Sequence, residues 1–225
     1  MLKIKKINSN DRSFSRDLQS HISKRKINTS DIKEKVRMII SEVKSKRDEA
    51  LVKYSKEYDN YDVQSANELE ISKEKCLEAL KKISKEEHDA LQFARSRIQE
   101  FSKHQKAKPW NYTSEGITLG EKITAIDKVG LYVPGGSAIY PSSVLMNSIP
   151  AKVAGVKEII MVVPSPKGKV NNMVLAAAYL GGVDRIFRIG GAHAIAALAF
   201  GTDTIPKVNM IVGPGSQYVA EAKKE

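Results

Sequence analysis

Apolar residues recur at helical spacing through the first half of the chain. Behind Thr29-Ser30-Asp31, a cluster with the residue types of a helix N-cap, they follow a period of about 3.6 residues to Glu57. This pattern predicts one long amphipathic helix over 29–57. It also predicts a helix after Ser72, another over about 85–106, and a weak helix that follows a short strand or arm within 1–28. The apolar positions of the three stronger helices are Ile32, Val36, Ile39, Ile40, Val43, Ala50, Leu51 and Tyr54; Cys76, Leu77, Leu80 and Ile83; and Leu91, Ala94, Ile98 and Phe101.

Residues 107–128 break the helical period and alternate apolar with polar positions, a pattern typical of a β-hairpin. Charge density falls after this segment, while glycine, alanine and valine become more frequent. We therefore expect two regions: a helical N-terminal region over 1–128, interpreted as an incomplete first domain, and a second domain over 129–225.

The second region alternates short Val/Ile-rich runs with helical stretches of about ten residues, a pattern that predicts a parallel sheet covered by helices on both faces. The fold class is thus α/β, with a helical N-terminal arm followed by a Rossmann-like domain. Ligands of such sheets bind outside the carboxyl ends of the strands. Strands are expected at 129–133, 158–163, 185–189 and 208–212, and helices at about 142–155, 170–181 and 192–200 and from about Gln217.

The stretch Val129–Val144 joins the first of these strands to a helix through a Pro-Gly-Gly turn and several small residues. Such a loop lets backbone N–H groups approach an anion, but a tight connection between strand and helix would also need glycine. The common dinucleotide fingerprint is not met, because Tyr218 stands where the third glycine of Gly213-Pro-Gly215 would be. No strand ends in an acid about twenty residues after a glycine turn, where it could hold a ribose.

Composition excludes several classes of protein. With 225 residues, 41% of them hydrophobic, the chain can bury a substantial core. No apolar run approaches the roughly 18 residues of a membrane span and no signal peptide is recognisable, so we expect a cytoplasmic protein with no membrane partner. The net charge of +11 is spread along the chain, with 26 basic and 18 acidic residues in 1–110 and 11 and 8 in 111–225. No nucleic-acid motif accompanies it, so no nucleic-acid partner is expected.

Candidate reactive side chains are few. The single cysteine, Cys76, lies in an apolar helical stripe, which favours a buried structural thiol over a nucleophile. Glu100 and His104 are one helical turn apart, but no further ligand is near them in sequence, and we expect no metal site and no catalytic residue in 1–225.

Three long motifs follow one another in the second region: Val129-Gly-Leu-Tyr-Val-Pro-Gly-Gly-Ser-Ala, Ile189-Gly-Gly-Ala-His-Ala-Ile-Ala-Ala-Leu-Ala-Phe-Gly-Thr and Ile211-Val-Gly-Pro-Gly-Ser-Gln-Tyr-Val-Ala-Glu-Ala-Lys. In this order they resemble the motifs of the histidinol dehydrogenase family. The resemblance implies two NAD-dependent steps that oxidise L-histidinol to L-histidine in histidine biosynthesis. It also implies a zinc-dependent homodimer built largely from two Rossmann-like domains.

The resemblance also assigns cofactor-binding residues. Tyr132 is the motif tyrosine that contacts NAD. His193 and Ser216 occupy the places of a glutamine and an asparagine with the same role, and both keep hydrogen-bonding capacity with a different reach. For His193, a helix-start residue satisfied by local hydrogen bonds is the alternative. The expected cofactor-binding set is Tyr132, Pro134, Gly135, Gly136, His193 and Ser216.

Family members are much longer than this chain. By the resemblance, the zinc ligands and the Glu-His pair that does the acid–base work have no counterpart in 1–225. We therefore expect a fragment that is inactive alone, with the apolar helix faces at 32–54 and 76–101 lacking their sheet. Two other hypotheses remain: a related dehydrogenase that acts on another small alcohol, and a nucleotide-binding module without catalysis.

Overall fold

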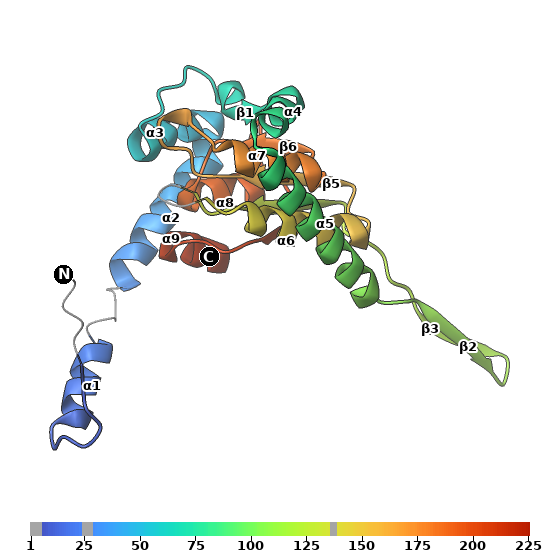
Figure 1. Cartoon of the computed structure of the whole chain (residues 1–225), viewed down its shortest axis with the longest axis horizontal. Helices are drawn as coiled ribbons and strands as arrows, with labels where there is room; N and C mark the ends of the chain where they lie inside the picture. Colours follow the sequence, from blue (N-terminus) through green and yellow to red (C-terminus); the bar gives the residue numbers. More distant parts are fainter. Residues whose placement is uncertain (1–5, 24–28, 136–138) are drawn as a thin grey trace.

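The protein is described here by a computed structural model, which covers residues 6–23, 29–135 and 139–225. At its centre lies a five-stranded sheet with the order β1-β6-β5-β4-β7 (Figure 1). The four strands of the second region are parallel, as the βα pattern predicts. They are β4 (Lys128–Tyr132), β5 (Glu158–Val162), β6 (Arg185–Phe187) and β7 (Met210–Val212).

Helices cover both faces of this sheet, which confirms the predicted α/β class. Successive strand residues point to opposite faces, so Ile160 and Val162 enter one core while Ile159 and Met161 enter the other. The first core is closed by α8 (Gly191–Phe200) and α9 (Gln217–Lys224), and the second by α6 (Pro141–Ala154) and α7 (Asn172–Leu180). Because α8 is apolar on nearly every side, it is buried almost throughout.

The helices of the first region pack on the same two cores. Val36 and Leu51 are fully buried together with Ile160, and Cys76 and Leu91 are buried in the cluster that contains Met161. The expectation that the helix faces at 32–54 and 76–101 lack a sheet is therefore wrong. These helices are α2 (Thr29–Lys46), α3 (Asp48–Asp59), α4 (Lys73–Lys82) and α5 (Lys85–Gln105).

The single helix expected over 29–57 is in fact two helices, α2 and α3, that meet at Arg47. The backbone of Arg47 has φ of 52°, in the left-handed region that interrupts a helix. Its guanidinium donates to the Gly201 carbonyl at 2.9 Å, and the Asp48 carboxylate accepts from the Thr204 hydroxyl at 2.6 Å. Both contacts are made to a loop more than 150 residues away, so helical periodicity alone could not reveal the break.

A fifth strand and a short 3-10 helix, both unpredicted, come from the first region. The strand β1 (Glu70–Ile71) follows η1 (Ala66–Leu69) and pairs antiparallel with β6. The Glu70 carboxylate receives two hydrogen bonds from the Arg185 guanidinium, each 2.7 Å long. Two residues are too few to show a period, so this strand leaves no detectable pattern in the sequence.

The predicted hairpin is present as β2 (Trp110–Ser114) and β3 (Ile117–Glu121), and it extends away from the body of the protein (Figure 1). Its turn residues Glu115 and Gly116 both have positive φ, as in the tight turns that join antiparallel strands. Every residue of the two strands is exposed. The first described helix, α1 (Phe14–Ser23), matches the weak helix expected within 1–28 and has no buried residue; the strand or arm expected before it lies partly in residues 1–5, outside the described residues.

None of the helices in the described ranges combines the length and apolarity needed to cross a membrane.

Candidate functional site

The loops that follow β4, β5, β6 and β7 meet at the carboxyl edge of the sheet, where α/β folds bind ligands. A pocket of about 320 Å³ opens there. Its walls come from the loops after β5 and β6, from the start of α9, and from α2 and α3 of the first region. The lining residues are Lys35, Ile39, Tyr58, Asp59, Pro164, Gly190, Gly191, Ala192, His193, Ser216 and Tyr218.

Tyr132, the last residue of β4, lies beside this pocket without lining it. Its ring is buried, and its hydroxyl accepts a hydrogen bond from the Gly191 N–H at 3.1 Å. Burial is the main cause that raises the pKa of the Tyr132 hydroxyl. The side chain thus ties the end of β4 to the first turn of α8, which forms one wall of the pocket.

His193 is the third residue of α8 and is 1% exposed. Its ring packs against Tyr54 and Tyr58, with ring centroids 5.4 and 6.0 Å away. Among the described residues, neither ring nitrogen has a hydrogen-bond partner, so the alternative of a locally satisfied histidine is wrong. Burial lowers the pKa of the ring to about 3, which keeps the imidazole neutral.

Ser216 is the N-cap residue of α9 and lines the same pocket as His193. In the described part of the chain its hydroxyl makes no capping hydrogen bond. Two of the predicted contact residues, far apart in the sequence, therefore meet at one pocket, with Tyr132 joined to it through Gly191.

The loop after β4 lies at a second, smaller pocket. Pro134 and Gly135 line a space of about 60 Å³, and Pro164 lines both pockets. A Cβ added to Gly135 would lie 2.6 Å from the Pro164 carbonyl oxygen, so this position requires glycine for loop packing. Gly136, the last of the expected contact residues, lies outside the described residues.

Sequence reasoning missed the contribution of α3 to the main pocket. Asp59, the last residue of α3, is 8% exposed, and its Oδ2 has no hydrogen-bond partner within the described ranges. Burial raises the pKa of the Asp59 carboxyl, opposed by a hydrogen bond from the Ser165 backbone. In the sequence this acid stands in a turn, Tyr58-Asp-Asn-Tyr-Asp, and nothing there indicates that it reaches the sheet edge.

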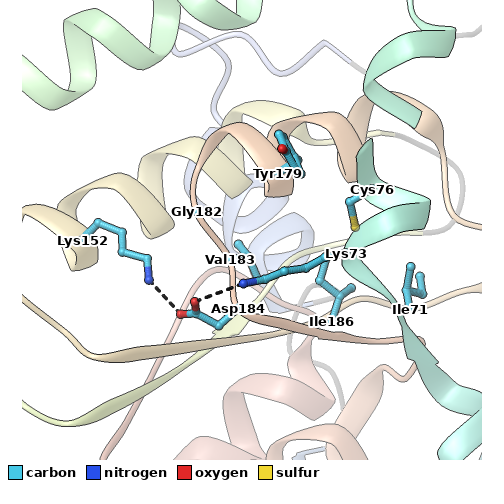
Figure 2. A pocket seen from close by; sticks show the side chains of 9 residues that line it. All are labelled: Ile71, Lys73, Cys76, Lys152, Tyr179, Gly182, Val183, Asp184 and Ile186. Atoms are coloured by element: carbon cyan, nitrogen blue, oxygen red, sulfur yellow. Dashed lines mark hydrogen bonds and ion pairs between the residues drawn. The ribbon is translucent and has the colours of Figure 1, made fainter. Parts of the chain in front are cut away.

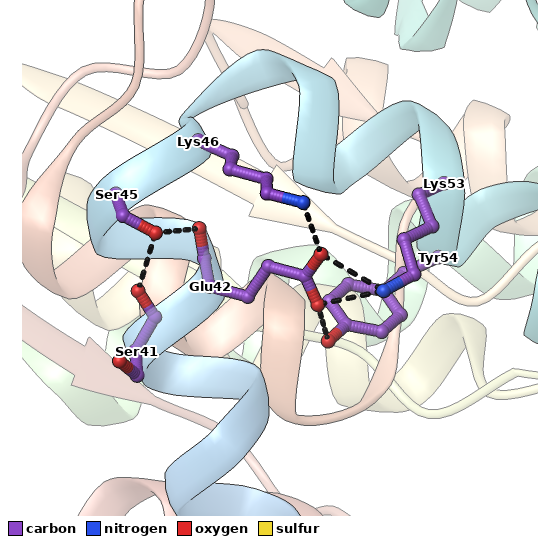
Figure 3. A network of polar contacts seen from close by, with 6 residues as sticks. All are labelled: Ser41, Glu42, Ser45, Lys46, Lys53 and Tyr54. Atoms are coloured by element: carbon purple, nitrogen blue, oxygen red, sulfur yellow. Dashed lines mark hydrogen bonds and ion pairs between the residues drawn. The ribbon is translucent and has the colours of Figure 1, made fainter.

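A polar network centred on Glu42 joins α2 to α3 (Figure 3). The Glu42 carboxylate accepts from the Tyr54 hydroxyl at 2.5 Å and from Lys53 at 2.8 Å. Hydrogen bonds from Lys53, Tyr54 and Lys46 lower the pKa of Glu42 to about 2. The anchored Tyr54 ring stacks on Tyr58, with centroids 5.5 Å apart and planes 4° from parallel. Glu42 thus holds in place the ring that packs against His193.

Another pocket, of about 350 Å³, lies at the opposite, amino ends of the strands (Figure 2). Its central acid, Asp184, accepts from the Ile159 N–H and from Lys152, both at 2.8 Å, and Lys73 lies 3.8 Å away. Cys76 lies at the same pocket, and burial raises the pKa of its thiol to about 11, in line with a structural cysteine.

No group of three or more histidine, cysteine or carboxylate side chains that could hold a metal ion occurs in the part of the chain that the structure describes. Glu100 and His104 form an exposed ion pair, 3.2 Å between oxygen and nitrogen, on the surface of α5. Both side chains are exposed, and the ion pair joins residues one helical turn apart.

A mostly parallel sheet covered on both faces, with a pocket at the carboxyl ends of its parallel strands, places the chain among Rossmann-like α/β proteins. Comparison with known proteins narrows this class: the family profile described as histidinol dehydrogenase matches residues 22–225. The chain belongs to the histidinol dehydrogenase family.

Individual relatives agree with this assignment. The chain is 46% identical to a histidinol dehydrogenase of Hydrogenovibrio crunogenus and 48% identical to one of Nitrosomonas europaea, with all of this chain covered in each case. A crystal structure of the histidinol dehydrogenase from Elizabethkingia anophelis is similar with a TM-score of 0.79 and 36% identity, over 85% of this chain and 44% of that one. The chain spans about half the length of the curated relatives it matches, 52% in both cases.

Proposed function

We propose that this chain supplies the NAD-binding part of a histidinol dehydrogenase, which oxidises L-histidinol to L-histidine in two NAD-dependent steps. The observation that carries the proposal is the pocket at the carboxyl edge, where His193 and Ser216 meet and to which Tyr132 is joined through Gly191. These are the three positions that the family motifs assign to NAD contacts.

The residues at the pocket suit a dinucleotide. The buried ring nitrogens of His193 lack partners in the described structure and could exchange hydrogen bonds with a polar ligand. The helices α8 and α9 both begin at the pocket, and their free N–H groups favour an anion such as the cofactor's phosphates. By the family motifs, Pro134, Gly135 and Gly136 belong to the same cofactor site, and the first two line the smaller neighbouring pocket. NAD, when bound, supplies the acceptor for the hydride removed from the substrate.

Zinc does not fit the residues that the structure describes, since they contain no metal-binding cluster. We place the zinc ligands and the acid–base residues in the half of the relatives that this chain does not match. The chain alone would then bind NAD without oxidising histidinol. Residues 129–225 would form the NAD-binding domain, with the helices of 1–128 as part of its cover, and the whole protein would be a homodimer as the resemblance implies.

Two alternative functions remain, the first suggested by the replacements at His193 and Ser216 and the second by the absence of catalytic residues from the matched half of the relatives. A dehydrogenase of another small alcohol would need the same cofactor but a different substrate site. A nucleotide-binding module would bind NAD and have no dehydrogenase activity, even when combined with the missing half of the relatives. The carboxyl-edge pocket is common to all three functions.

Calorimetric titration of the chain 1–225 with NAD tests the proposal. We expect saturable binding at one site. Zinc and L-histidinol should not lead to NADH formation by this chain alone, followed at 340 nm. Absence of NAD binding would refute the cofactor assignment, while NADH formation would refute the placement of the chemistry in the unmatched half of the relatives.

A further inference from the structure

The side chain of Asp59 is unusual for its position. It is a carboxylate at the carboxyl end of α3, where the helix dipole disfavours negative charge. It is buried, and in the described structure only one of its oxygens finds a partner, the Ser165 backbone. Each of these features raises the free energy of the ionised carboxylate in the folded protein.

Packing and folding do not explain this arrangement. No salt bridge to Asp59 occurs in the described ranges, and an asparagine would accept the same hydrogen bond from Ser165 without a buried charge. The nearest acid in sequence, Asp62, is exposed and paired with Lys56 at 3.0 Å. A group that lowers stability and lines a pocket is characteristic of a functional site.

The surroundings of Asp59 match the adenosine part of a dinucleotide. The adjacent Tyr58 lines the same pocket and is 52% exposed, so its ring offers a flat surface to a base. Asp59 lines this pocket, and its Oδ2 has no partner within the described residues, so it remains available as an acceptor. A carboxylate at this place can accept hydrogen bonds from two vicinal hydroxyls, the role that an acid downstream of the glycine turn has in common Rossmann folds.

We infer that Asp59 accepts hydrogen bonds from the adenosine ribose hydroxyls of the nucleotide and thereby selects NAD over NADP. This inference rests on the proposed NAD-binding function. It supplies the ribose-binding acid that is missing after the glycine turns of the second region, and it draws this acid from the first region. Lys35, which lines the pocket from α2, would then bind the bridging phosphates of the nucleotide.

The expected selectivity for NAD over NADP follows from the negative charge of the Asp59 carboxylate. The 2′-phosphate of NADP would replace a hydroxyl donor by a group that only accepts hydrogen bonds and carries negative charge beside a buried carboxylate. Wild-type protein should therefore bind NADP at least about tenfold more weakly than NAD, a difference of the size that one charged hydrogen bond supplies.

The test is calorimetric titration of chain 1–225 with NAD and with NADP, for the wild type and for Asp59→Asn. We expect Asp59→Asn to weaken NAD binding about tenfold and to leave NADP binding unchanged or stronger, so that the two affinities become similar. Thermal unfolding without nucleotide provides a second readout: Asp59→Asn should be at least as stable as the wild type, because it removes a buried charge.

Asp62→Asn is the matched control, since it makes the same charge change three residues away at an exposed site, and it should alter neither affinity. If Asp59→Asn does not fold, Asp59→Glu keeps the charge and should retain the preference for NAD with weaker binding. A wild-type preference for NADP, or an unchanged ratio of affinities in a folded Asp59→Asn, would overturn the inference and leave NAD binding intact. Absence of binding of either nucleotide to the wild type would instead refute the proposed function and the inference together.

Discussion

The two pockets at opposite ends of the sheet have similar volumes but differ in whether their buried polar groups have hydrogen-bond partners. At the amino edge, the Asp184 carboxylate is held by Lys152 and by the Ile159 N–H (Figure 2). At the carboxyl edge, His193 and Asp59 keep polar atoms that have no partner within the described residues. Proteins satisfy buried polar groups almost everywhere, and the exceptions call for a functional reason. The contrast separates a structural pocket from a candidate binding pocket of nearly equal size.

The largest effect that would sharpen this contrast is a dependence of stability on pH at His193. Burial holds its pKa at about 3, below the ordinary 6.5, so the folded protein keeps the ring neutral while the unfolded chain takes up a proton. The free energy of unfolding should therefore be largest above pH 6.5 and fall as the pH drops toward 3. Because one proton corresponds to about 1.4 kcal/mol per pH unit, wild type should lose about 2 to 3 kcal/mol relative to His193→Gln between pH 6.5 and 4.5.

Urea unfolding of both proteins at several pH values measures this difference. The comparison with His193→Gln is needed because other carboxyls titrate in the same range. The raised pKa of Asp59 acts in the opposite direction, since protonation on acidification relieves its buried charge. The lowered pKa of Glu42 means that its stabilisation is present above about 4.5 and is lost as the pH falls toward 2. If the free energy of unfolding changed with pH in the same way for wild type and His193→Gln, a buried, neutral histidine would be contradicted.

A smaller effect is expected at the amino-edge pocket. Asp184→Ala removes the acceptor of the Ile159 N–H and leaves Lys152 without its partner, so the free energy of unfolding should fall by about 2 kcal/mol. Asp184→Asn keeps an acceptor for Ile159 and should recover part of this loss. Denaturant unfolding gives the stabilities, and titration with NAD should show no change for Asp184→Asn. A loss of NAD affinity as large as that expected for Asp59→Asn would remove the distinction between the two pockets.

The smallest effect concerns the two positions where the family motifs have other residues. Changing both His193→Gln and Ser216→Asn should strengthen NAD binding several-fold, worth about 1 kcal/mol, because the amide side chains restore the family's hydrogen-bonding reach. Each single variant should give part of the gain in the same titration. Unchanged affinity in the double variant would remove both residues from the NAD site.

Most elements of both regions could be predicted from local pattern, but part of the first region could not. The four parallel strands with their helices, and the hairpin and the helices α4 and α5 of the first region, leave periodic or turn signals within a few residues. The break at Arg47 depends on contacts with the loop of Gly201 and Thr204, and β1 is too short to carry a period. The predicted site residues Tyr132, His193 and Ser216 came from family motifs, and the structure brings them to one pocket edge.

The sequence by itself determined the α/β class, the family and the loops where a ligand should bind, because strand and helix periods and motif residues are local properties of a chain. Tertiary structure alone decided that α2 to α5 cover the sheet and that Asp59 reaches the pocket beside His193. The packing of one apolar face on another and the loss of hydrogen-bond partners on burial depend on residues that are far apart in the sequence. A local sequence pattern therefore predicts neither the packing nor the missing hydrogen-bond partners.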